Sequence, residues 1–298
     1  MNYVIIFNGL GNQMSQYAFF LAKKQKNPKC KLLIIDNPKS HNGYELNKVF
    51  NIKNQERISD KIIRWIYIHL YNRNFKIRKL LNYLCFRVIY EPRNYDYTPD
   101  LLEHKELGIN LYWGGWHSEK YFHSIEKEIR KVFTFNDKDL NLQVQEDKEY
   151  LKILEEIKSN NNSISLHVRR GDYLNIKPDD YWQLGGVATE EYYQKCINYI
   201  QEHVTNPHFY IFSNDIEWCQ NNLKLKNVTF ITCNQGKKSW RDLHLMSECR
   251  HHIIANSSFS WWGAWLSPHK AGITLHPRWF IRNVETKDFY PEKWICIQ

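Results

Sequence analysis

Short apolar runs alternate with helical patterns through the second half of the chain, and this alternation constrains the fold more than any other feature. Parallel strands need crossover connections, which are usually helices, so the pattern predicts a doubly wound parallel α/β sheet. The expected strands are 163–168, 208–213, 228–232, 252–255 and 272–276. The expected helices are 189–203 with Thr189 as N-cap, 215–223, 239–250 and 258–266.

The first half opens in the same way, with a strand at 3–7, a helix near 13–25 and a strand at 31–36. Its middle, 55–105, predicts a mostly helical insertion. A polar Asn/Ser cluster at 159–163 marks a domain boundary. We therefore expect domains at 1–160 and 161–280, with 281–298 packing back on the first, which suits a chain of 298 residues.

No apolar run is long enough to cross a membrane. The longest runs, such as 3–7 and 31–35, have about five residues, whereas a spanning helix needs roughly 20. The start of the chain lacks the pattern of a signal peptide. The seven cysteines are scattered without a CxxC pair, which favours reduced thiols. We expect a cytoplasmic protein.

Positive charge is concentrated in 61–90, which holds seven Lys/Arg and no acidic residue in a chain of net charge +9. The favoured interpretation is a pair of amphipathic helices packed on the domain, with the basic side chains reaching outward. A peripheral contact with the inner membrane face is the second. Nucleic acid is the least favoured, and we expect none as a partner.

Polar side chains follow three of the predicted strands. The first set runs from His167 through Arg169 and Arg170 to Asp172, the second is Asn214 and Asp215, and the third is 256–260. Ligands bind beyond the carboxyl ends of the strands in an open parallel sheet. The convergence of three sets at one edge predicts a ligand site there.

An arginine pair suits a diphosphate, because guanidinium binds phosphate oxygens in a bidentate way. Neighbours in extended chain point to opposite sides, so we expect one arginine to reach the ligand while the other, with Asp172, braces the turn. The alternative is a structural ion-pair network. Ser257 and Ser258 begin a helix, where an anion is stabilised, although simple N-capping is the alternative. Phe259 is a candidate to stack on a base, and the tryptophans at 261, 262 and 265 fit a core.

Other motifs are weaker. Gly9 and Gly11 form a turn between strand and helix, but Met14 stands where a dinucleotide fingerprint needs its third glycine. Neither HExxH nor GxSxG occurs. The DKD sequence at 137–139 fits the acidic start of a helix better than a metal site. The pair His251 and His252 is interpreted as structural.

Four segments resemble the alpha-1,2-fucosyltransferase family, which is inverting, GDP-fucose-dependent and carries an HxRRxD motif. They are GLGNQMSQYA at 9–18, HVRRGDY at 167–173, FSND at 212–215 and NSSFSWWGAWL at 256–266. The resemblance covers nearly the whole chain. Ser15 departs from the pattern where Phe is common, and His117 departs where Gln is frequent, which could alter acceptor choice but not the reaction.

The resemblance implies a GT-B type glycosyltransferase with two Rossmann-like domains facing a cleft, the first on the acceptor side and the second binding GDP-beta-L-fucose. It implies transfer of L-fucose, with inversion and without a metal or cofactor, to the 2-hydroxyl of a terminal beta-galactose on an oligosaccharide or lipid-linked glycan. The alternatives are a fucosyltransferase of another linkage and a non-catalytic carbohydrate-binding protein.

The resemblance also implies roles for individual residues. Arg169 would grip the beta-phosphate, and Asn12 would lie near the reacting sugar, so these two are the catalytic candidates. The expected donor-binding set is Gly11, His167, Arg169, Asp172, Asn214, Asp215, Ser257, Ser258, Phe259 and Ser260. The weaker acceptor-binding set is Trp116, His117 and Glu119. Glu119 and Asp172 are candidates for a general base, and neither is preferred.

Overall fold

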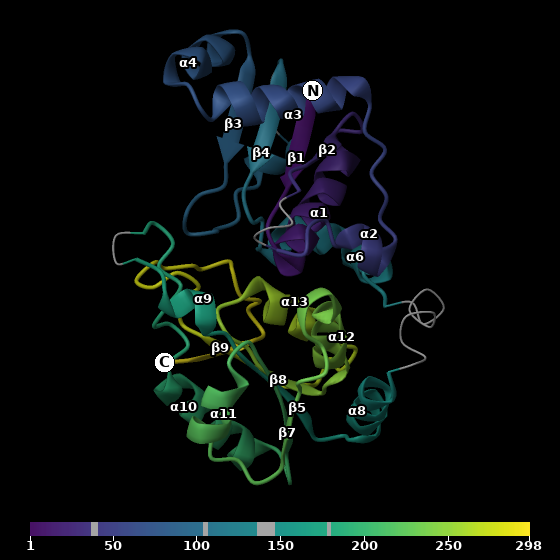
Figure 1. The fold of residues 1–298 in the computed structure, drawn as a ribbon, viewed down its shortest axis with the longest axis vertical. Helices are drawn as coiled ribbons and strands as arrows, with labels where there is room; N and C mark the ends of the chain where they lie inside the picture. The colour runs from purple at the N-terminus through teal and green to yellow at the C-terminus, as the bar shows by residue number, and fades with distance from the viewer. Residues whose placement is uncertain (37–40, 104–106, 136–146, 178–179) are drawn as a thin grey trace. The chain divides into compact units, whose positions relative to one another are not determined.

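The computed structural model describes all residues except 37–40, 104–106, 136–146 and 178–179. The chain divides into two compact units, Met1–Thr134 and Phe135–Gln298. Each unit contains a parallel sheet with helices connecting its strands (Figure 1). The predicted α/β class is confirmed in both units.

The first unit has a four-stranded parallel sheet in the order β2-β1-β4-β3. Its strands are β1 (Asn2–Ile6), β2 (Lys31–Ile34), β3 (Phe86–Tyr90) and β4 (Ile109–Trp113). Every residue of β1 is buried, because β2 and β4 flank it on either side. From β1 the chain adds β2 on one side, and then β3 and β4 on the other side, so the strand order switches between β1 and β4.

The first unit contains several short helical segments around one long helix. They are α1 (Leu10–Lys26), α2 (Leu46–Phe50), α3 (Ile58–Ile66), the π-helical turn η1 (Tyr67–Tyr71), α4 (Phe75–Tyr83), α5 (Asp100–Glu103), the 3-10 turns η2 (Glu119–Tyr121) and η3 (His123–Ile125), and α6 (Glu126–Val132). Helix α1 begins at Leu10, three residues before the predicted start, so Gly11 lies within the first turn of the helix.

The predicted helical insertion at 55–105 is correct for α3, η1 and α4 but wrong at β3. The sequence of β3, FRVIY, is rich in aromatic and β-branched residues, and the strand pairs with β4 along its whole length. Gly108 precedes β4 with φ +91°, and an added Cβ there would lie 2.0 Å from the Cys85 carbonyl oxygen. Only glycine allows the two strands to begin so close together.

The second unit has a six-stranded parallel sheet in the order β10-β9-β8-β5-β6-β7. Its strands are β5 (Ser163–Val168), β6 (His208–Ser213), β7 (Val228–Phe230), β8 (His251–Ile253), β9 (Thr274–Pro277) and β10 (Ile295–Ile297). Its helices are α8 (Lys148–Ser159), α9 (Gly171–Leu174), α10 (Glu190–His203), α11 (Ile216–Asn222), η4 (Gly236–Lys238), α12 (Trp240–Glu248) and α13 (Ser258–Leu266).

The strand order gives the second sheet a switch point between β5 and β8. From β5 the chain first builds outward through β6 and β7, and then returns to the other side of β5 to add β8, β9 and β10. In open parallel sheets, ligands bind at the carboxyl ends of the strands on either side of such a switch point, here β5 and β8. The predicted doubly wound parallel sheet is confirmed.

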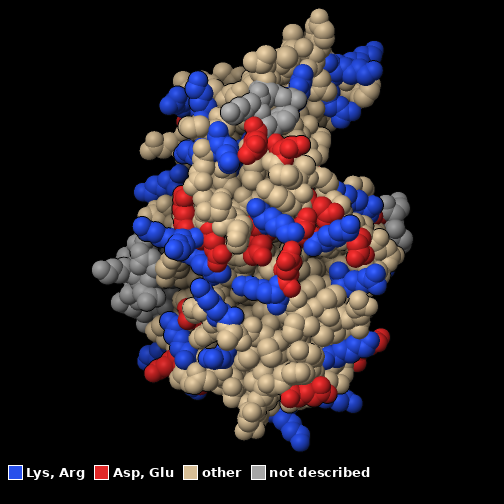
Figure 2. All heavy atoms as spheres, turned by 180° about the vertical axis from the view of Figure 1, so that it is seen from behind, with Lys and Arg blue, Asp and Glu red and all other residues tan. Residues whose placement is uncertain are grey.

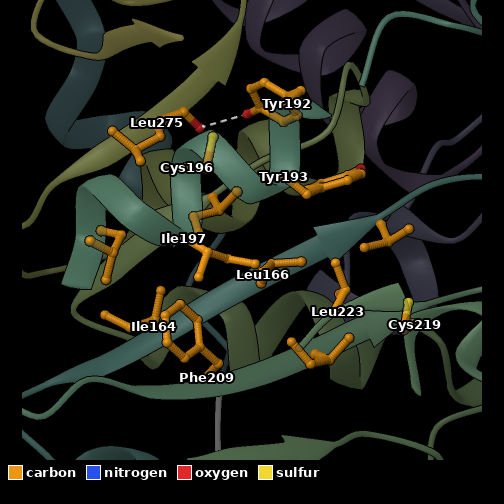
Figure 3. Packing of buried hydrophobic residues seen from close by; sticks show 14 of the residues in the cluster. Ile164, Leu166, Tyr192, Tyr193, Cys196, Ile197, Phe209, Cys219, Leu223 and Leu275 are labelled. Atoms are coloured by element: carbon orange, nitrogen blue, oxygen red, sulfur yellow. Dashed lines mark hydrogen bonds between the residues drawn. The ribbon is translucent and has the colours of Figure 1, made fainter. Parts of the chain in front are cut away.

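Helix α10 covers one face of this sheet (Figure 3). Tyr193, Cys196 and Ile197 pack with Ile164 and Leu166 of β5, and all five are 1% exposed or less. The hydroxyl of Tyr192 donates to the carbonyl oxygens of Ile254 at 2.7 Å and Leu275 at 3.4 Å. The buried phenol is thereby satisfied and ties the helix to the residue after β8 and to β9. Thr189 caps α10 as predicted, accepting from the Tyr192 amide.

The unit boundary lies earlier than the predicted residue 160. Helix α8 belongs to the second unit because the Tyr150 hydroxyl lies 2.6 Å from Nδ1 of His244 on α12. Asp147, the N-cap of α8, also pairs with Arg241 at 2.6 Å. At the other end, β10 pairs with β9, so the residues after 280 belong to the second unit rather than to the first.

Candidate active site

The three predicted polar sets follow three adjacent strands. Strand β5 lies between β6 and β8, with Val168 opposite Ser213 and Leu166 opposite Ile253. Both pairings are parallel, so the residues after these strands leave the same edge of the sheet. The predicted convergence at the carboxyl ends of the strands is present, and it lies at the switch point.

Arg170 is held by three contacts within the protein. Its Nε lies 3.1 Å from Oδ2 of Asp215, and its amide donates to Oδ1 of Asn214 at 3.0 Å. Its guanidinium carbon lies 4.0 Å from the centre of the Trp218 ring. Asp215 also caps α11 by accepting from the Trp218 amide. These contacts make Arg170 the arginine that joins the loops after β5 and β6.

Arg169 makes a weaker contact. Its Nη2 lies 2.8 Å from Oδ2 of Asp172, and the side chains are 33% and 58% exposed. Exposed ion pairs of this kind contribute about 1 kcal/mol or less, so an anion can displace the carboxylate. Arg170 is therefore braced within the protein, whereas Arg169 is the more exposed of the two arginines. The second arginine was expected to brace the turn together with Asp172; instead, Asp172 pairs with Arg169 and Asp215 holds Arg170.

The turn after β5 is tightly packed. Gly171 has φ +32°, and an added Cβ would lie 2.4 Å from Nδ2 of Asn214. The hydroxyl of Tyr173 donates to the carbonyl oxygen of Asn256 at 3.3 Å. Burial raises the pKa of Tyr173 to about 12, so the phenol keeps its proton near neutral pH. The turn that carries Arg169 is thus anchored to the chains leaving β6 and β8.

His167 is neutral and lacks a protein partner for one ring nitrogen. Burial, and secondarily the nearby Arg169, lower its pKa to about 3. Within the described part of the chain, its Nδ1 is buried with no hydrogen-bond partner. Its ring centre lies 6.0 Å from that of Phe259. An unsatisfied buried nitrogen costs about 1–3 kcal/mol, which a bound ligand could offset.

Helix α13 begins beside this edge. The hydroxyl oxygen of Ser257 accepts from the Phe259 amide at 3.3 Å, so the predicted N-cap is present. Ser258 is 9% exposed, and the Ser260 hydroxyl donates to the Ser257 carbonyl at 3.4 Å. The first-turn amides and the positive end of the helix dipole favour an anion here.

Phe259 stands apart from its neighbours. Every other residue of 251–265 is buried, including Trp261, Trp262 and Trp265, which form the expected core. Phe259 alone in that stretch is partly exposed. An aromatic face left open beside a helix N-terminus is available for stacking.

Asn256 has a role that the sequence did not show. Its amide donates to the carbonyl oxygens of Leu184 and Phe280, both at 2.9 Å. It therefore fixes two loops at the end of β8. An asparagine directly after a buried strand is a signal for such loop bridging.

In the first unit, Gly11 and Asn12 lie in the first turn of α1. Gln16, about one turn further along α1, bridges the ends of β1 and β4: it accepts from the Phe7 amide at 2.9 Å and donates to the Gly114 carbonyl at 3.1 Å. Gln13 donates to the Asn8 carbonyl at 2.7 Å. The sequence singled out the motif that holds these glutamines but not their bridging function.

Trp116, which was predicted to bind the acceptor, does not offer an exposed ring on which a sugar could stack. Its side chain is 0% exposed and stacks on Phe19 with ring centres 4.2 Å apart. His117 is also buried, and burial lowers its pKa to about 3. Glu119 begins η2 and is half-buried. The backbone of Trp116 is left-handed, with φ +55°, and its ring packs on Phe19 and edge-on against Tyr121.

Glu91 was not predicted, although it holds the loop that contains Trp116. It follows β3, and its Oε2 accepts from the amides of Gly115 and Trp116, both at 2.7 Å. Burial raises its pKa to about 8. The contact spans 24 residues, so no local pattern in the sequence points to it.

Metal binding finds no support in the part of the chain that the structure describes, where no three His, Cys, Asp or Glu side chains are grouped to hold an ion. The DKD sequence at 137–139 lies outside the described residues. His251 accepts from the Ile273 amide at 3.0 Å, and His252 lies 2.8 Å from the Ser165 hydroxyl, as expected of structural residues. Among the described helices, none has the length and apolarity to cross a bilayer.

A family model described as "Glycosyl transferase family 11" matches residues 1–298. The chain belongs to this family. It is therefore a glycosyltransferase, and the resemblance drawn from the four sequence segments is confirmed.

This family 11 enzyme is 35% identical over 304 residues to an alpha-1,2-colitosyltransferase of Escherichia coli, covering 97% of this chain and 96% of that protein. It is 28% identical over 183 residues to human galactoside alpha-(1,2)-fucosyltransferase 1, covering 59% of this chain and 49% of that protein. Among solved structures it is similar to the Bradyrhizobium alpha-1,6-fucosyltransferase NodZ, with 13% identity, a TM-score of 0.47 and coverage of 90% and 92%.

Proposed function

We propose that this enzyme transfers L-fucose from GDP-beta-L-fucose to the 2-hydroxyl of a terminal beta-galactose, inverting the anomeric centre and forming an alpha-1,2 linkage. Two relatives named for alpha-1,2 transfer support the linkage, and the human one is named for a galactoside acceptor. The acceptor is an oligosaccharide or a lipid-linked glycan. The two α/β units correspond to the two domains of a GT-B enzyme.

The position of Arg169 and of the N-terminus of α13 at the same edge of the second sheet supports the proposal. As the bond to the sugar breaks, negative charge grows on the departing diphosphate and positive charge on the sugar ring. The guanidinium of Arg169 and the positive end of the α13 dipole stabilise the leaving group without a metal ion. Phe259 stacks on the base, and His167, Ser257 and Ser258 contact the nucleotide. The acceptor hydroxyl attacks the opposite face of the sugar.

Asp172, Asn214, Asp215 and Ser260 complete the proposed site in the second unit, and Gly11 and Asn12 are the proposed contributors of the first unit to donor binding and catalysis. Asn214 and Asp215 act by holding Arg170 and the turn before α11. When the donor binds, its phosphate takes the place of the Asp172 carboxylate as the partner of Arg169. Glu119 remains the candidate base in the first unit, because Asp172 is engaged in this exchange.

The direct test incubates the enzyme with GDP-beta-L-fucose and methyl beta-galactoside, measures GDP release and assigns the product linkage by NMR. We expect an alpha-1,2 product, and we expect the same rate in EDTA. A 1,6 linkage would replace the proposed one, and loss of activity in EDTA would point to a metal-dependent reaction. Absence of GDP release with any beta-galactoside would favour a carbohydrate-binding protein.

GDP-colitose is a second candidate donor. It is supported by the similarity to the colitosyltransferase, which extends over nearly the whole length of both proteins. Colitose is L-fucose without its 3-hydroxyl, so the donors differ by one polar group. A site that hydrogen-bonds this hydroxyl discriminates strongly against its absence, whereas an apolar site discriminates weakly. The ratio of kcat/KM for the two GDP-sugars decides between them.

We further propose that helices α3 and α4 rest on an anionic membrane surface. Ile58, Ile62 and Trp65 form one stripe of α3 and are 78%, 53% and 54% exposed. Helix α4 has no buried residue, and its Phe75 and Tyr83 are 60% and 84% exposed. Over α4, at the upper right of Figure 2, basic side chains lie beside uncharged surface. Two copies of this basic face would repel each other, whereas anionic lipid complements it.

Vesicle sedimentation tests this contact. We expect binding to vesicles of phosphatidylcholine with phosphatidylglycerol but not to phosphatidylcholine alone. The double substitution of Trp65 and Phe75 by Ser should abolish sedimentation, whereas Leu151→Ser, at a partly exposed residue of α8, should not. Equal sedimentation of both variants, or a dimer that dissociates only in the double variant, contradicts the membrane contact.

A further inference from the structure

A cavity of about 450 Å³ opens in the first unit beyond the carboxyl end of β2. Its walls come from the end of β2, the segment before α3, and the inner side of α3 and η1. The lining residues are Ile34, Ile35, Asp36, Tyr44, Asn54, Glu56, Arg64 and Ile68. The volume is within the roughly 300–1,000 Å³ typical of small-molecule sites.

One side of the cavity is a fixed charged pair. Nη1 of Arg64 lies 2.5 Å from Oε1 of Glu56 and 3.3 Å from the Ile34 carbonyl oxygen. The side chains are only 31% and 16% exposed. The guanidinium and carboxylate are therefore held in place before any ligand arrives, which lowers the cost of ordering them on binding.

Asn54 supplies an unused donor. Its Nδ2 is buried and has no hydrogen-bond partner among the described residues. Leaving such a group unpaired costs about 1–3 kcal/mol. An oxygen atom of a ligand in the cavity would satisfy it, so the cavity favours a ligand rich in oxygen acceptors.

The charges select the ligand class. Asp36 and Glu56 outnumber Arg64, so a phosphate or other anion is disfavoured, and the amide of Asn54 and the phenol of Tyr44 suit neutral hydroxyl groups. Ile34, Ile35 and Ile68 provide an apolar wall. A sugar ring has hydroxyl edges and an apolar face, and this combination matches it.

We propose that this cavity binds a sugar residue of the acceptor glycan on the reducing side of the terminal galactose. The proposal rests on the proposed function, because it takes the acceptor to be a galactose-terminated glycan. It adds a site for acceptor length: a longer glycan binds more tightly than a single galactoside because the cavity holds a further residue.

Asn54→Leu tests the site by removing the donor and filling the space. The probes are methyl beta-galactoside and lacto-N-tetraose, a tetrasaccharide that ends in beta-galactose. We expect the wild-type KM for the tetrasaccharide to be at least tenfold below that for the monosaccharide. The variant should lose this advantage while its kcat, its monosaccharide KM and its donor KM stay unchanged. Asn47→Leu, at an exposed residue of α2, is the matched control.

Two further experiments distinguish a loss of sugar binding from a folding defect in Asn54→Leu. The first uses Asn54→Asp, which keeps the shape of the side chain. The second is saturation-transfer NMR of the tetrasaccharide in the absence of donor. Signal transfer to the residues preceding the galactose is expected in the wild type and lost in both Asn54 variants. An unchanged tetrasaccharide KM, or an unchanged NMR pattern in both variants, overturns the site. Failure of the wild type to transfer to methyl beta-galactoside instead contradicts the proposed function.

Discussion

The hydroxyl oxygen of Ser15 lies 3.0 Å from Nδ1 of His117 in the interior of the first unit. The same hydroxyl lies 3.3 Å from the Gly11 carbonyl oxygen, to which it donates. Since the pKa of His117 is lowered to about 3 by burial, the ring is neutral, and its Nδ1 shares a hydrogen bond with the Ser15 hydroxyl. Ser15 and His117 are the two departures from the family pattern that the resemblance suggested, and they are neighbours in the fold.

We expect a double-mutant cycle to measure this coupling. Ser15→Phe should lower the free energy of unfolding by about 1–3 kcal/mol, because the larger ring meets the rigid imidazole. Adding His117→Gln should recover at least about 0.5 kcal/mol, since the flexible amide can make room. Chemical denaturation provides the values, with exposed His123→Gln as the control. Strict additivity would show that the pair is not coupled.

Glu91 should make stability depend on pH. Its pKa is raised from 4.5 to about 8, so the folded state holds a proton that the unfolded state has lost across that range. The free energy of unfolding therefore falls as pH rises towards 8. Relative to Glu91→Gln, the wild type should lose about 2 kcal/mol between pH 6.5 and 8.5.

The glutamine variant is a suitable comparison because its carbonyl oxygen can still accept from the amides of Gly115 and Trp116. The buried histidines, with lowered pKa values, change stability mainly below pH 6.5 and are shared by both proteins. Parallel stability curves for the two proteins across pH 6.5–8.5 would mean that Glu91 is ionised in the folded state.

Much of the second unit could be predicted from local patterns. Strands β5 and β6 and helix α13 begin and end at the predicted residues, because each apolar run is bounded by polar residues or glycine. Strand β3 was missed because it lies in a basic, helical stretch and is defined by pairing with β4. Its identity as a strand depends on residues about twenty positions away.

The site shows the same division. The polar sets were predicted because parallel strands place their carboxyl ends at one edge. Which arginine pairs with Asp172 and which with Asp215 could not be predicted, since this depends on side-chain directions in a turn. Trp116 was misinterpreted because a tryptophan in a loop has the same sequence pattern whether its ring is exposed or buried.

Arg170→Met should lower the stability of the protein more than a substitution of Arg169 does. The substitution removes the contact with Asp215 at 3.1 Å and the packing on Trp218 at 4.0 Å. We expect the free energy of unfolding to fall by about 1–3 kcal/mol. Thermal or urea denaturation measures it, with Lys195→Met, at a residue paired on the surface of α10, as control. A loss no larger than that of the control would show that Arg170 does not brace the turn.

Phe259→Ala should weaken binding of the donor without disturbing the hydrophobic core. The ring is partly exposed, whereas its neighbours are buried, so its removal leaves the tryptophan packing intact. Loss of stacking on a base is worth about 1–3 kcal/mol, which corresponds to a donor KM raised about 5- to 150-fold. Steady-state kinetics with a fixed acceptor measures this, and an unchanged donor KM would place the base elsewhere.

Binding of GDP to Arg169→Ala, measured by isothermal titration calorimetry, tests the capture of the diphosphate most directly. Because Arg169 is exposed and its pair with Asp172 is weak, the variant should unfold at the wild-type temperature. Its Kd for GDP should rise at least about 50-fold, for the loss of a charged bidentate contact, and its kcat should fall by several orders of magnitude. Wild-type GDP affinity and turnover in a folded Arg169→Ala protein would contradict the account.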